Sequence, residues 1–138
     1  MRVLLFILYS LFFREQGEER RETMKENILL EKSLDFATRI IKLRDYLIKK
    51  KETTIAKQII RSATSIGANA NEAIYGVTKP DFINKLHIAL KECAETEYWL
   101  KLILKAGYIE EKLGESLLED CLELKKILVA SVKTAKGN

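Results

Sequence analysis

The sequence has few residues that interrupt helices or form tight turns: one proline and six glycines in 138 residues. A fold built from hairpins and β-turns needs many more of both, because these residues supply the special backbone angles of turns. The chain is 47% hydrophobic, and its length suits one domain with a core of useful size. The composition therefore favours a single all-α domain over a turn-rich β fold.

Cysteine and histidine are also scarce. Cys93 and Cys121 lie far apart, form no CxxC pair and have no histidine close by in the sequence. This spacing argues against a disulfide framework or a zinc site, and it fits a reducing cytoplasm, which is the location we expect. Both cysteines fall on apolar helical positions, so we interpret them as small buried hydrophobic side chains.

The residues on which helical enzymes depend are missing or misplaced. A di-iron bundle takes Glu-x-x-His pairs as ligands, but the single histidine, His87, has Asn84 at that spacing. Helical ribonucleases of the HEPN type carry an arginine a few residues before their histidine, and residues 81–83 hold none. Glu92 and Glu95 imitate only part of the magnesium motif of all-α nucleotide pyrophosphohydrolases. The sequence has no phosphate-binding glycine loop or serine triad signature either, so we expect no catalysis, cofactor, metal or small-molecule substrate.

The N-terminal segment differs from the rest of the chain. Its apolar run is shorter than the roughly 20 residues of a membrane-spanning helix, and no small-x-small cleavage site follows it. Arg20-Arg21 can be encoded by AGGAGG, a ribosome-binding sequence, shortly before Met24. We therefore expect residues 1–23 to be a leader translated from a mis-assigned start codon, and residues 24–138 to be the folded domain. The alternative is a genuine extension, either disordered or a short amphipathic helix that touches a membrane.

Apolar residues recur every three or four positions over four stretches, the pattern of amphipathic helices. Thr53 or Thr54 is the expected N-cap of the second helix and Thr78 that of the third, while Gly76 and Gly107 are expected to end these two helices. Four helices joined by short turns predict an antiparallel up-down four-helix bundle. The expected helices cover residues 26–50, 53–76, 78–105 and 110–134.

The apolar lines of these helices are the expected core. The first helix contributes Leu29, Leu30, Leu34, Phe36, Ala37, Ile40, Ile41, Leu43, Leu47 and Ile48. The second contributes mainly isoleucine and alanine, and the third leucine, phenylalanine and Cys93. The fourth contributes Leu113, Leu117, Cys121, Leu124, Leu128 and Val132.

Charge is distributed unevenly along the chain. Eight basic residues stand against two acids between residues 39 and 61, and six acids against one lysine between residues 108 and 124. Such a molecule can bind a polyanion on one side, or place its acidic side on the basic side of a neighbour. The residues that we consider for contact with phosphates are Arg39, Lys42, Arg44, Lys49, Lys50, Lys51 and Lys57.

The second helix carries a polar line beside its apolar one. Arg61, Ser65, Asn69 and Glu72 follow one another at helical spacing, although serine and asparagine are mediocre helix formers. We interpret this line as packing within the bundle, or alternatively as a subunit interface or a surface that faces RNA. The third helix offers Glu92, Glu95 and Glu97 as partners, followed by Tyr98 and Trp99.

Because a charge near the apolar line is costly unless paired, we expect Arg61 to contact a carboxylate of the third helix, with Glu97 the one nearest the apolar line. The contact would lie within the bundle or across subunits. Tyr98 and Trp99 are expected to be core or interface anchors rather than platforms for base stacking, since aromatic side chains contribute much of the energy of interfaces.

Two segments separated by seven residues make a long two-part motif: RSATSIGANANEA from Arg61 and DFINKLHIALKECAETEYWL from Asp81. Through this motif the sequence, from Met24 to about Lys136, closely resembles the four-helix-bundle family of 23S rRNA intervening-sequence proteins. That family is related to the accessory variability determinant protein of diversity-generating retroelements, a basic pentameric partner of a reverse transcriptase and RNA. The resemblance implies self-assembly as a homopentamer and a partner that is structured RNA or a ribonucleoprotein.

A run of basic residues is by itself most often a solvated helix surface. Together with the resemblance, it leads us to expect a non-enzymatic homo-oligomer that binds RNA or a ribonucleoprotein through its basic surface. The alternative is a protein–protein adaptor or scaffold without nucleic-acid binding, whose charge asymmetry serves the stacking of subunits.

Overall fold

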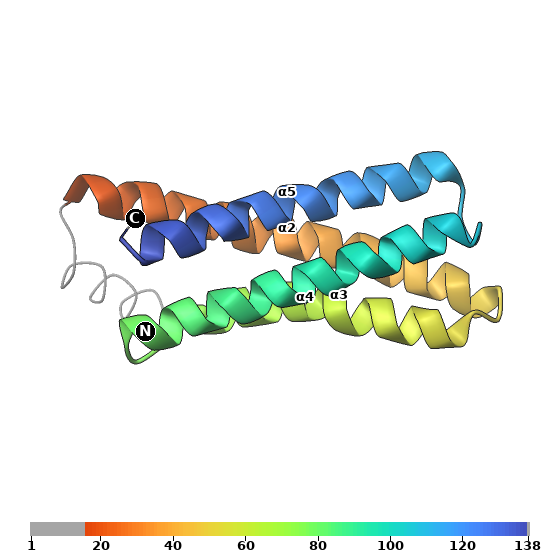
Figure 1. Ribbon diagram of the computed structural model, residues 1–138, viewed down its shortest axis with the longest axis horizontal. Coiled ribbons are helices and arrows are strands. Elements are labelled where there is room, and N and C mark those ends of the chain that lie inside the picture. Colours follow the sequence, from red (N-terminus) through yellow and green to blue (C-terminus); the bar gives the residue numbers. More distant parts are fainter. Residues whose placement is uncertain (1–15, 138) are drawn as a thin grey trace.

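The computed structural model describes residues 16–137, with side chains from residue 28 onward, and this part of the chain holds four helices and no strand (Figure 1). The predicted all-α fold is therefore confirmed. Of the predicted leader, residues 1–15 lie outside the described residues, whereas residues 16–23 belong to the first helix. The helices are α2 (Gln16–Lys49), α3 (Thr53–Ala73), α4 (Lys79–Lys105) and α5 (Glu111–Ala135).

Consecutive helices pack side by side, and α5 returns beside α2 (Figure 1). Ion pairs between α3 and α4 show that the two run antiparallel. Arg61, early in α3, meets Glu95, whereas Glu72, near the end of α3, meets Lys85 in the first half of α4. The turns at residues 50–52 and 106–110 therefore lie at the same end of an up-down bundle.

The helix ends agree with the sequence predictions in part. Thr78 caps α4 as predicted, because its hydroxyl accepts a hydrogen bond from the backbone N–H of Asp81 at 3.2 Å. The prediction that Thr53 or Thr54 caps α3 is wrong. Glu52 holds the N-cap position there and makes no side-chain capping bond.

Two predicted helix-ending glycines act in different ways. Gly107 follows α4 with φ 74°, the left-handed conformation that glycine adopts without strain. Gly76 allows a close approach instead: a Cβ there would lie 2.9 Å from the backbone N of Phe82. Both glycines thus mark turns.

The core runs along the bundle axis and is lined unequally by the four helices. Large aliphatic side chains dominate on α2, α4 and α5, whereas the buried side chains of α3 are Ala56, Ile59, Ser62, Ala63, Ile66, Ala70 and Ala73. Because alanine adds little bulk, α3 can approach its neighbours closely. A buried polar contact accompanies this approach: the hydroxyls of Ser62 and Thr96 lie 2.9 Å apart, and each is within hydrogen-bond distance of a carbonyl of its own helix.

The two cysteines are buried, as predicted, and are not bonded to each other. Their Sγ atoms face one another across the α4–α5 contact at 3.9 Å. The hydrogen bond with Cys93 and burial raise the pKa of the Cys121 thiol. The pair therefore acts as neutral apolar packing.

Four large apolar side chains that were predicted to face inward lie on the surface instead. Leu34, Ile41, Ile48 and Leu113 are exposed to 70, 40, 45 and 43%. The apolar residues of α2 cover more of its circumference than a single buried line can take, so one edge of the helix stays outside.

The contact between α2 and α3 generates a stability prediction. A Cβ at Gly67 would lie 2.8 Å from Oγ and 3.2 Å from Cβ of Ser33, and that hydroxyl is held by a hydrogen bond to the Leu30 carbonyl at 2.9 Å. Gly67→Ala should lower the free energy of unfolding by about 1–2 kcal/mol in spite of alanine's better helix propensity. Ser33→Ala should recover part of this loss. A double-mutant cycle by urea denaturation measures the coupling, and strictly additive effects would contradict it.

Candidate functional site

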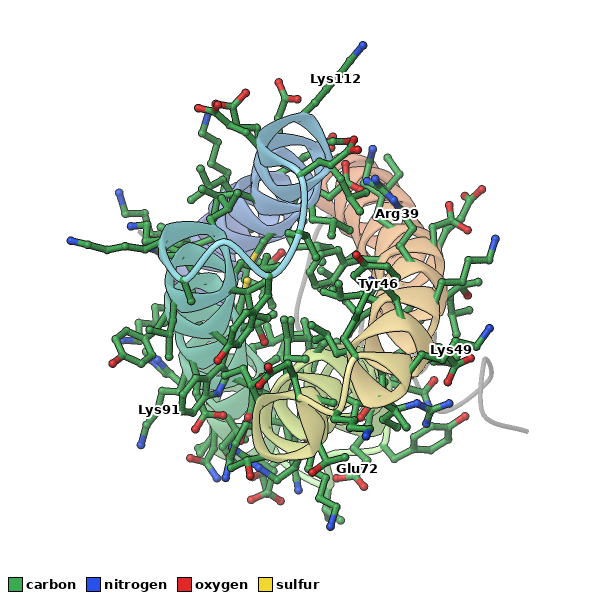
Figure 2. All side chains as sticks on the ribbon, turned by 90° about the vertical axis from the view of Figure 1, so that its right-hand side faces the viewer. Arg39, Tyr46, Lys49, Glu72, Lys91 and Lys112 are labelled. Atoms are coloured by element: carbon green, nitrogen blue, oxygen red, sulfur yellow. The ribbon has the colours of Figure 1, made fainter. Side chains whose placement is uncertain are left out.

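The basic residues gather around the turn that joins α2 to α3. Lys49, Lys50 and Lys51 lie at this turn and Lys57 lies in α3; we call these four residues the basic turn. All four are exposed, and none forms an ion pair with any side chain from residue 28 to 137. In the view onto this end of the bundle, Lys49 points away from the helices (Figure 2). Their charges are therefore available to a partner.

The end of α2 gives the basic turn its shape. Lys49 lies in the last helical turn, at the negative end of the helix dipole, where a cation is favourable. The chain then reverses through Lys51, whose φ of 66° is left-handed. This geometry lets the Glu52 N–H donate to the Leu47 carbonyl at 2.9 Å. A lysine thus occupies the place that glycine usually takes.

An aromatic residue lies next to the basic turn. The ammonium group of Lys50 sits 5.6 Å from the ring centroid of Tyr46, a cation–π contact. The neighbouring turn between α4 and α5 is tied to this end through Tyr108, whose pKa is raised by the charge of Glu52 and by a hydrogen bond to its carboxylate. The two turns therefore support each other.

The other three predicted phosphate-binding residues lie further along α2 and differ in their state. Arg39 pairs with Asp120 and donates to the Ser116 hydroxyl at 3.1 Å, so its guanidinium joins α2 to α5. Arg44 pairs with its neighbour Asp45 at 3.0 Å. Lys42 is exposed. The structure thus assigns Arg39 a structural contact, which sequence reasoning missed.

The α4–α5 side of the same end holds exposed acids, with the exposed Lys105 of α4 close to them. Glu110, Glu111 and Glu115 are exposed there, beside Lys112, which points outward from α5 (Figure 2). The basic and acidic stretches of the sequence therefore lie on different sides of one molecule. A second cross-link, between Lys32 and Glu123 at 2.8 Å, joins α2 and α5 farther along.

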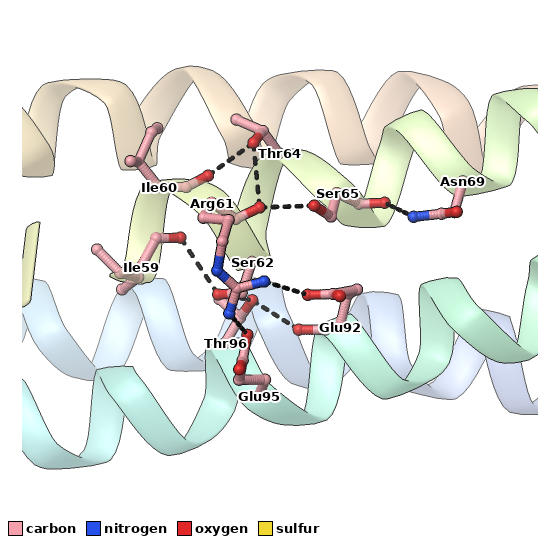
Figure 3. Close-up of polar contacts among 10 residues, drawn as sticks. All are labelled: Ile59, Ile60, Arg61, Ser62, Thr64, Ser65, Asn69, Glu92, Glu95 and Thr96. Carbon is pink, nitrogen blue, oxygen red and sulfur yellow. Dashed lines mark hydrogen bonds and ion pairs between the residues drawn. The ribbon is translucent and has the colours of Figure 1, made fainter. Parts of the chain in front are cut away.

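The predicted contact between Arg61 and a carboxylate of the third helix is present (Figure 3). The guanidinium of Arg61 pairs with Glu95, and its Nη1 lies 3.5 Å from Oε2 of Glu92. Of the three candidate carboxylates, Glu97 is not a partner of Arg61, because its side chain points toward α5. A helical pattern places carboxylates on a face but does not tell which of two neighbouring helices that face meets.

Glu97 instead joins α4 to α5. Its carboxylate accepts hydrogen bonds from Lys101 at 2.7 Å and from Lys125 at 2.9 Å, and its side chain is only 14% exposed. The hydrogen bonds with Lys101 and Lys125 hold the pKa of Glu97 below its ordinary range, against the effect of burial. The pair of Glu97 and Lys125 is the most buried ion pair among the described side chains.

The remaining polar residues of α3 bond mainly within their own helix (Figure 3). The Ser65 hydroxyl donates to the Arg61 carbonyl at 2.7 Å, and the Asn69 amide donates to the Ser65 carbonyl at 2.8 Å. Glu72 reaches across to Lys85 at 2.7 Å. The predicted polar line thus exists, and its contacts satisfy polar groups inside one subunit.

The two aromatic residues of α4 have different surroundings. Trp99 packs partly buried against the core, and its Nε1 has no hydrogen-bond partner within the described residues. Tyr98 is 59% exposed and meets the Trp99 ring edge-on at a centroid distance of 5.1 Å. Trp99 therefore anchors the core, while Tyr98 belongs to the surface.

The described residues hold neither a candidate metal site nor a candidate membrane span. No group of three or more histidine, cysteine, aspartate or glutamate side chains lies close enough to hold a metal ion there. Among the same residues, no helix is both long and apolar enough to cross a membrane.

Comparisons with known proteins agree on one family. The family model of the 23S rRNA-intervening sequence protein matches residues 25–130. A crystal structure of a protein with unknown function from the S23 ribosomal protein family of Bacteroides thetaiotaomicron VPI-5482 is 46% identical, with a TM-score of 0.76. The match covers 79% of this chain and 98% of that chain. No curated protein matches the sequence.

The left-handed residue of the basic turn generates a prediction. Lys51→Gly should raise the free energy of unfolding by about 0.5–1 kcal/mol, because glycine adopts a positive φ without steric cost. Lys51→Val should lower it. Lys50→Gly is the matched control, since it removes the same charge at a residue whose φ is not positive. Urea denaturation distinguishes the variants, and equal effects of the two glycine substitutions would contradict the assignment.

The Glu97 ion pair generates a pH prediction. A lowered pKa means that its stabilisation is fully present above the ordinary value of 4.5 and is lost as pH falls through the folded-state pKa. Glu97→Gln should therefore cost about 1–3 kcal/mol at neutral pH, and the difference from wild type should shrink in acid. Glu119→Gln, at an exposed position of α5, is the control. A difference that stays constant from pH 7 to 3 would contradict this role.

Proposed function

The chain belongs to the family of 23S rRNA-intervening sequence proteins, and from this membership we propose that it is a non-enzymatic, self-associating bundle that binds RNA or a ribonucleoprotein through the basic turn. The single observation that carries the proposal is the state of the four lysines. They are exposed, close in sequence and outside every ion pair among the described side chains.

Phosphates are a suitable partner for such a surface for a physical reason. Lysines that are already paired must give up a carboxylate before they contact a phosphate, whereas those of the basic turn give up only water and counterions. Release of the counterions condensed on a nucleic acid is the main source of affinity in such contacts. RNA is the proposed polyanion because the family takes its name from a sequence within 23S rRNA.

Self-association would strengthen this binding. A single basic turn offers only a few phosphate contacts, and these are weak at physiological salt. Several copies held in one assembly act on the same RNA with a high effective concentration. We propose a homopentamer on the strength of the resemblance.

The alternative function, a protein–protein adaptor, has an observation in its favour as well. Leu34 is the most exposed large apolar side chain on any described helix, at 70%, and such a residue suits protein contacts better than contacts with phosphate. Binding of RNA at low salt separates the two functions, because an adaptor has no need of it.

We therefore predict the salt dependence of RNA binding. Wild type should bind a mixed-sequence hairpin RNA at 50 mM salt, and its affinity should fall steeply toward 200 mM. Lys49→Glu/Lys50→Glu should weaken binding and lower the slope of log affinity against log salt by about 2, or about 1 per lost phosphate contact. Fluorescence anisotropy of labelled RNA measures both quantities.

Lys91→Glu/Lys136→Glu is the matched control. It changes the net charge by the same amount at exposed positions on α4 and beyond the end of α5, away from the basic turn. Absence of wild-type binding at low salt would remove the proposed function and favour the adaptor. Equal losses in the two double variants would show that overall charge, and not the basic turn, is responsible.

A further inference from the structure

An open groove lies between α2 and α3, with a volume of about 520 Å³. Its floor is narrow because Gly67 lets the two helices come close at Ser33. Its α2 wall carries Leu34, 70% exposed. We call this surface the α2–α3 groove; its lining residues are Leu30, Ser33, Leu34, Ala37, Thr64, Gly67, Ala68 and Asn71.

The groove is part of a longer apolar line. Leu34, Ile41 and Ile48 recur every seven residues on the outer side of α2 and are each at least 40% exposed. They extend over about 21 Å of helix, from the rise per residue. Single exposed apolar residues are ordinary, but a regular seven-residue repeat is the pattern by which one helix receives another. The line therefore fits a docked helix.

A helix with matching features is present on the other side of the same molecule. The outer side of α5 exposes Leu122 and Val129, seven residues apart and 37% exposed each. They line a second surface groove together with Lys125, Lys126, Ala130 and Lys133. Toward its start, α5 exposes three acids, Glu111, Glu115 and Glu119, and one lysine, Lys112, seven residues before Glu119. We call this surface the α5 outer face.

We propose that the α5 outer face of a second copy of this chain docks in the α2–α3 groove. This inference rests on the self-association that is part of the proposed function, and it names the two surfaces that meet. Figure 2 shows α5 and the α2–α3 side on different sides of the bundle, so the contact joins unlike surfaces head to tail. Repetition of such a contact closes a ring of copies when the rotation between neighbours allows it.

The contacts inside one chain supply the register. In a ring whose copies lie parallel to its axis, equivalent residues stay at the same level along that axis. The pairs of Lys32 with Glu123 and of Arg39 with Asp120 place this stretch of α5 level with residues 32–39. Leu122 of one copy is then level with Leu34 of the next, at the α2–α3 groove.

Charge supports the same register at the turn end. Arg44 and Lys57 lie seven residues beyond Ala37 and seven before Thr64, so both continue the α2–α3 side toward the basic turn. Arg44 already pairs with its neighbour Asp45, whereas Lys57 forms no ion pair among the described side chains. Along the bundle axis, these cations lie within about one helical turn of the height of Glu111 and Glu115 of the docked helix. Opposite charges therefore meet there.

The far end of the α2–α3 groove has the reverse pairing. Glu31, exposed on α2 next to Leu30, lies at this end, whereas the carboxylate of Glu72 is turned toward Lys85 of α4. Lys126 of the docked α5, three residues past Glu123, lies at the same height along the bundle axis as this end of the groove. The acidic start and the basic second half of α5 thus each face the opposite charge, whereas an antiparallel placement of the copies would bring like charges together at both ends.

The experiment compares assembly size by sedimentation velocity. Wild type should exceed the monomer mass of 15.9 kDa. Leu34→Asp and Leu122→Asp should each shift the protein to monomer, because each places a charge in the buried centre of the contact. Leu102→Asp is the control, since Leu102 is similarly exposed at 39% but lies on α4. Folding of each variant is checked by circular dichroism.

Charge exchange tests the register. Lys57→Glu and Glu115→Lys should each weaken assembly at least several-fold, and the double variant should restore it. In a mixture of Leu34→Cys and Leu122→Cys proteins, a short bis-maleimide should link the two different chains, while neither variant alone should be linked to itself. Linking of two Leu34→Cys chains to each other would overturn the proposal in favour of a twofold contact.

The outcomes separate this inference from the proposed function. A wild-type monomer at every concentration would overturn both the self-association and this contact. An assembly that survives Leu34→Asp and Leu122→Asp would overturn the contact alone. RNA binding is read independently by the salt titration, so its absence leaves the contact standing.

Discussion

The close approach of α3 to its neighbours is the constraint on which the bundle depends. Its inward line repeats alanine every seven residues, at Ala56, Ala63 and Ala70, and small side chains let helix backbones come together. Gly67 allows the same close approach toward α2, because a methyl group at this position would collide with Ser33. The serine and threonine content of this helix pair follows from the same constraint, because at such short range buried hydroxyls can bond across and back to their own helices.

The seams between helices are held in two different ways. Ion pairs cross from α2 to α5 at Arg39, from α3 to α4 at Arg61, and from α4 to α5 at Glu97. Among the described side chains, none crosses from α2 to α3. That seam depends on close contact alone, and it carries the open apolar groove. The seam without charges is therefore the one suited to an added helix, since a docked apolar surface there displaces no ion pair.

Periodicity made the four helices predictable, because each keeps an apolar line over at least five turns. Cap chemistry made the start of α4 predictable at Thr78. Periodicity did not predict which apolar residues of α2 are buried, because the apolar side of this helix is broader than the part that the bundle covers. Leu34 and Ile41 follow the same three- and four-residue spacing as Leu29 and Ile40, and only the placement of neighbouring helices decides which of them is buried. The sequence offered three carboxylates as partners of Arg61 and could not choose among them for a related reason: Glu95 and Glu97 are two residues apart, about 200° around a helix, and thus face different neighbours.

The two proposed surfaces share cations, and this has a consequence for binding. In the proposed assembly, Arg44 and Lys57 lie level with carboxylates of the adjacent copy, which neutralise part of their charge. Lys49 and Lys50 lie past the end of α5, at the turn, and keep theirs. Assembly would thus narrow the phosphate-binding surface to the tip of each bundle while repeating it around the ring. Salt acts on both contacts in the same direction but to different extents, because the helix contact has an apolar centre and the phosphate contact has none. As the salt concentration rises, the assembly should therefore release RNA first, and its copies should separate from one another only at higher salt.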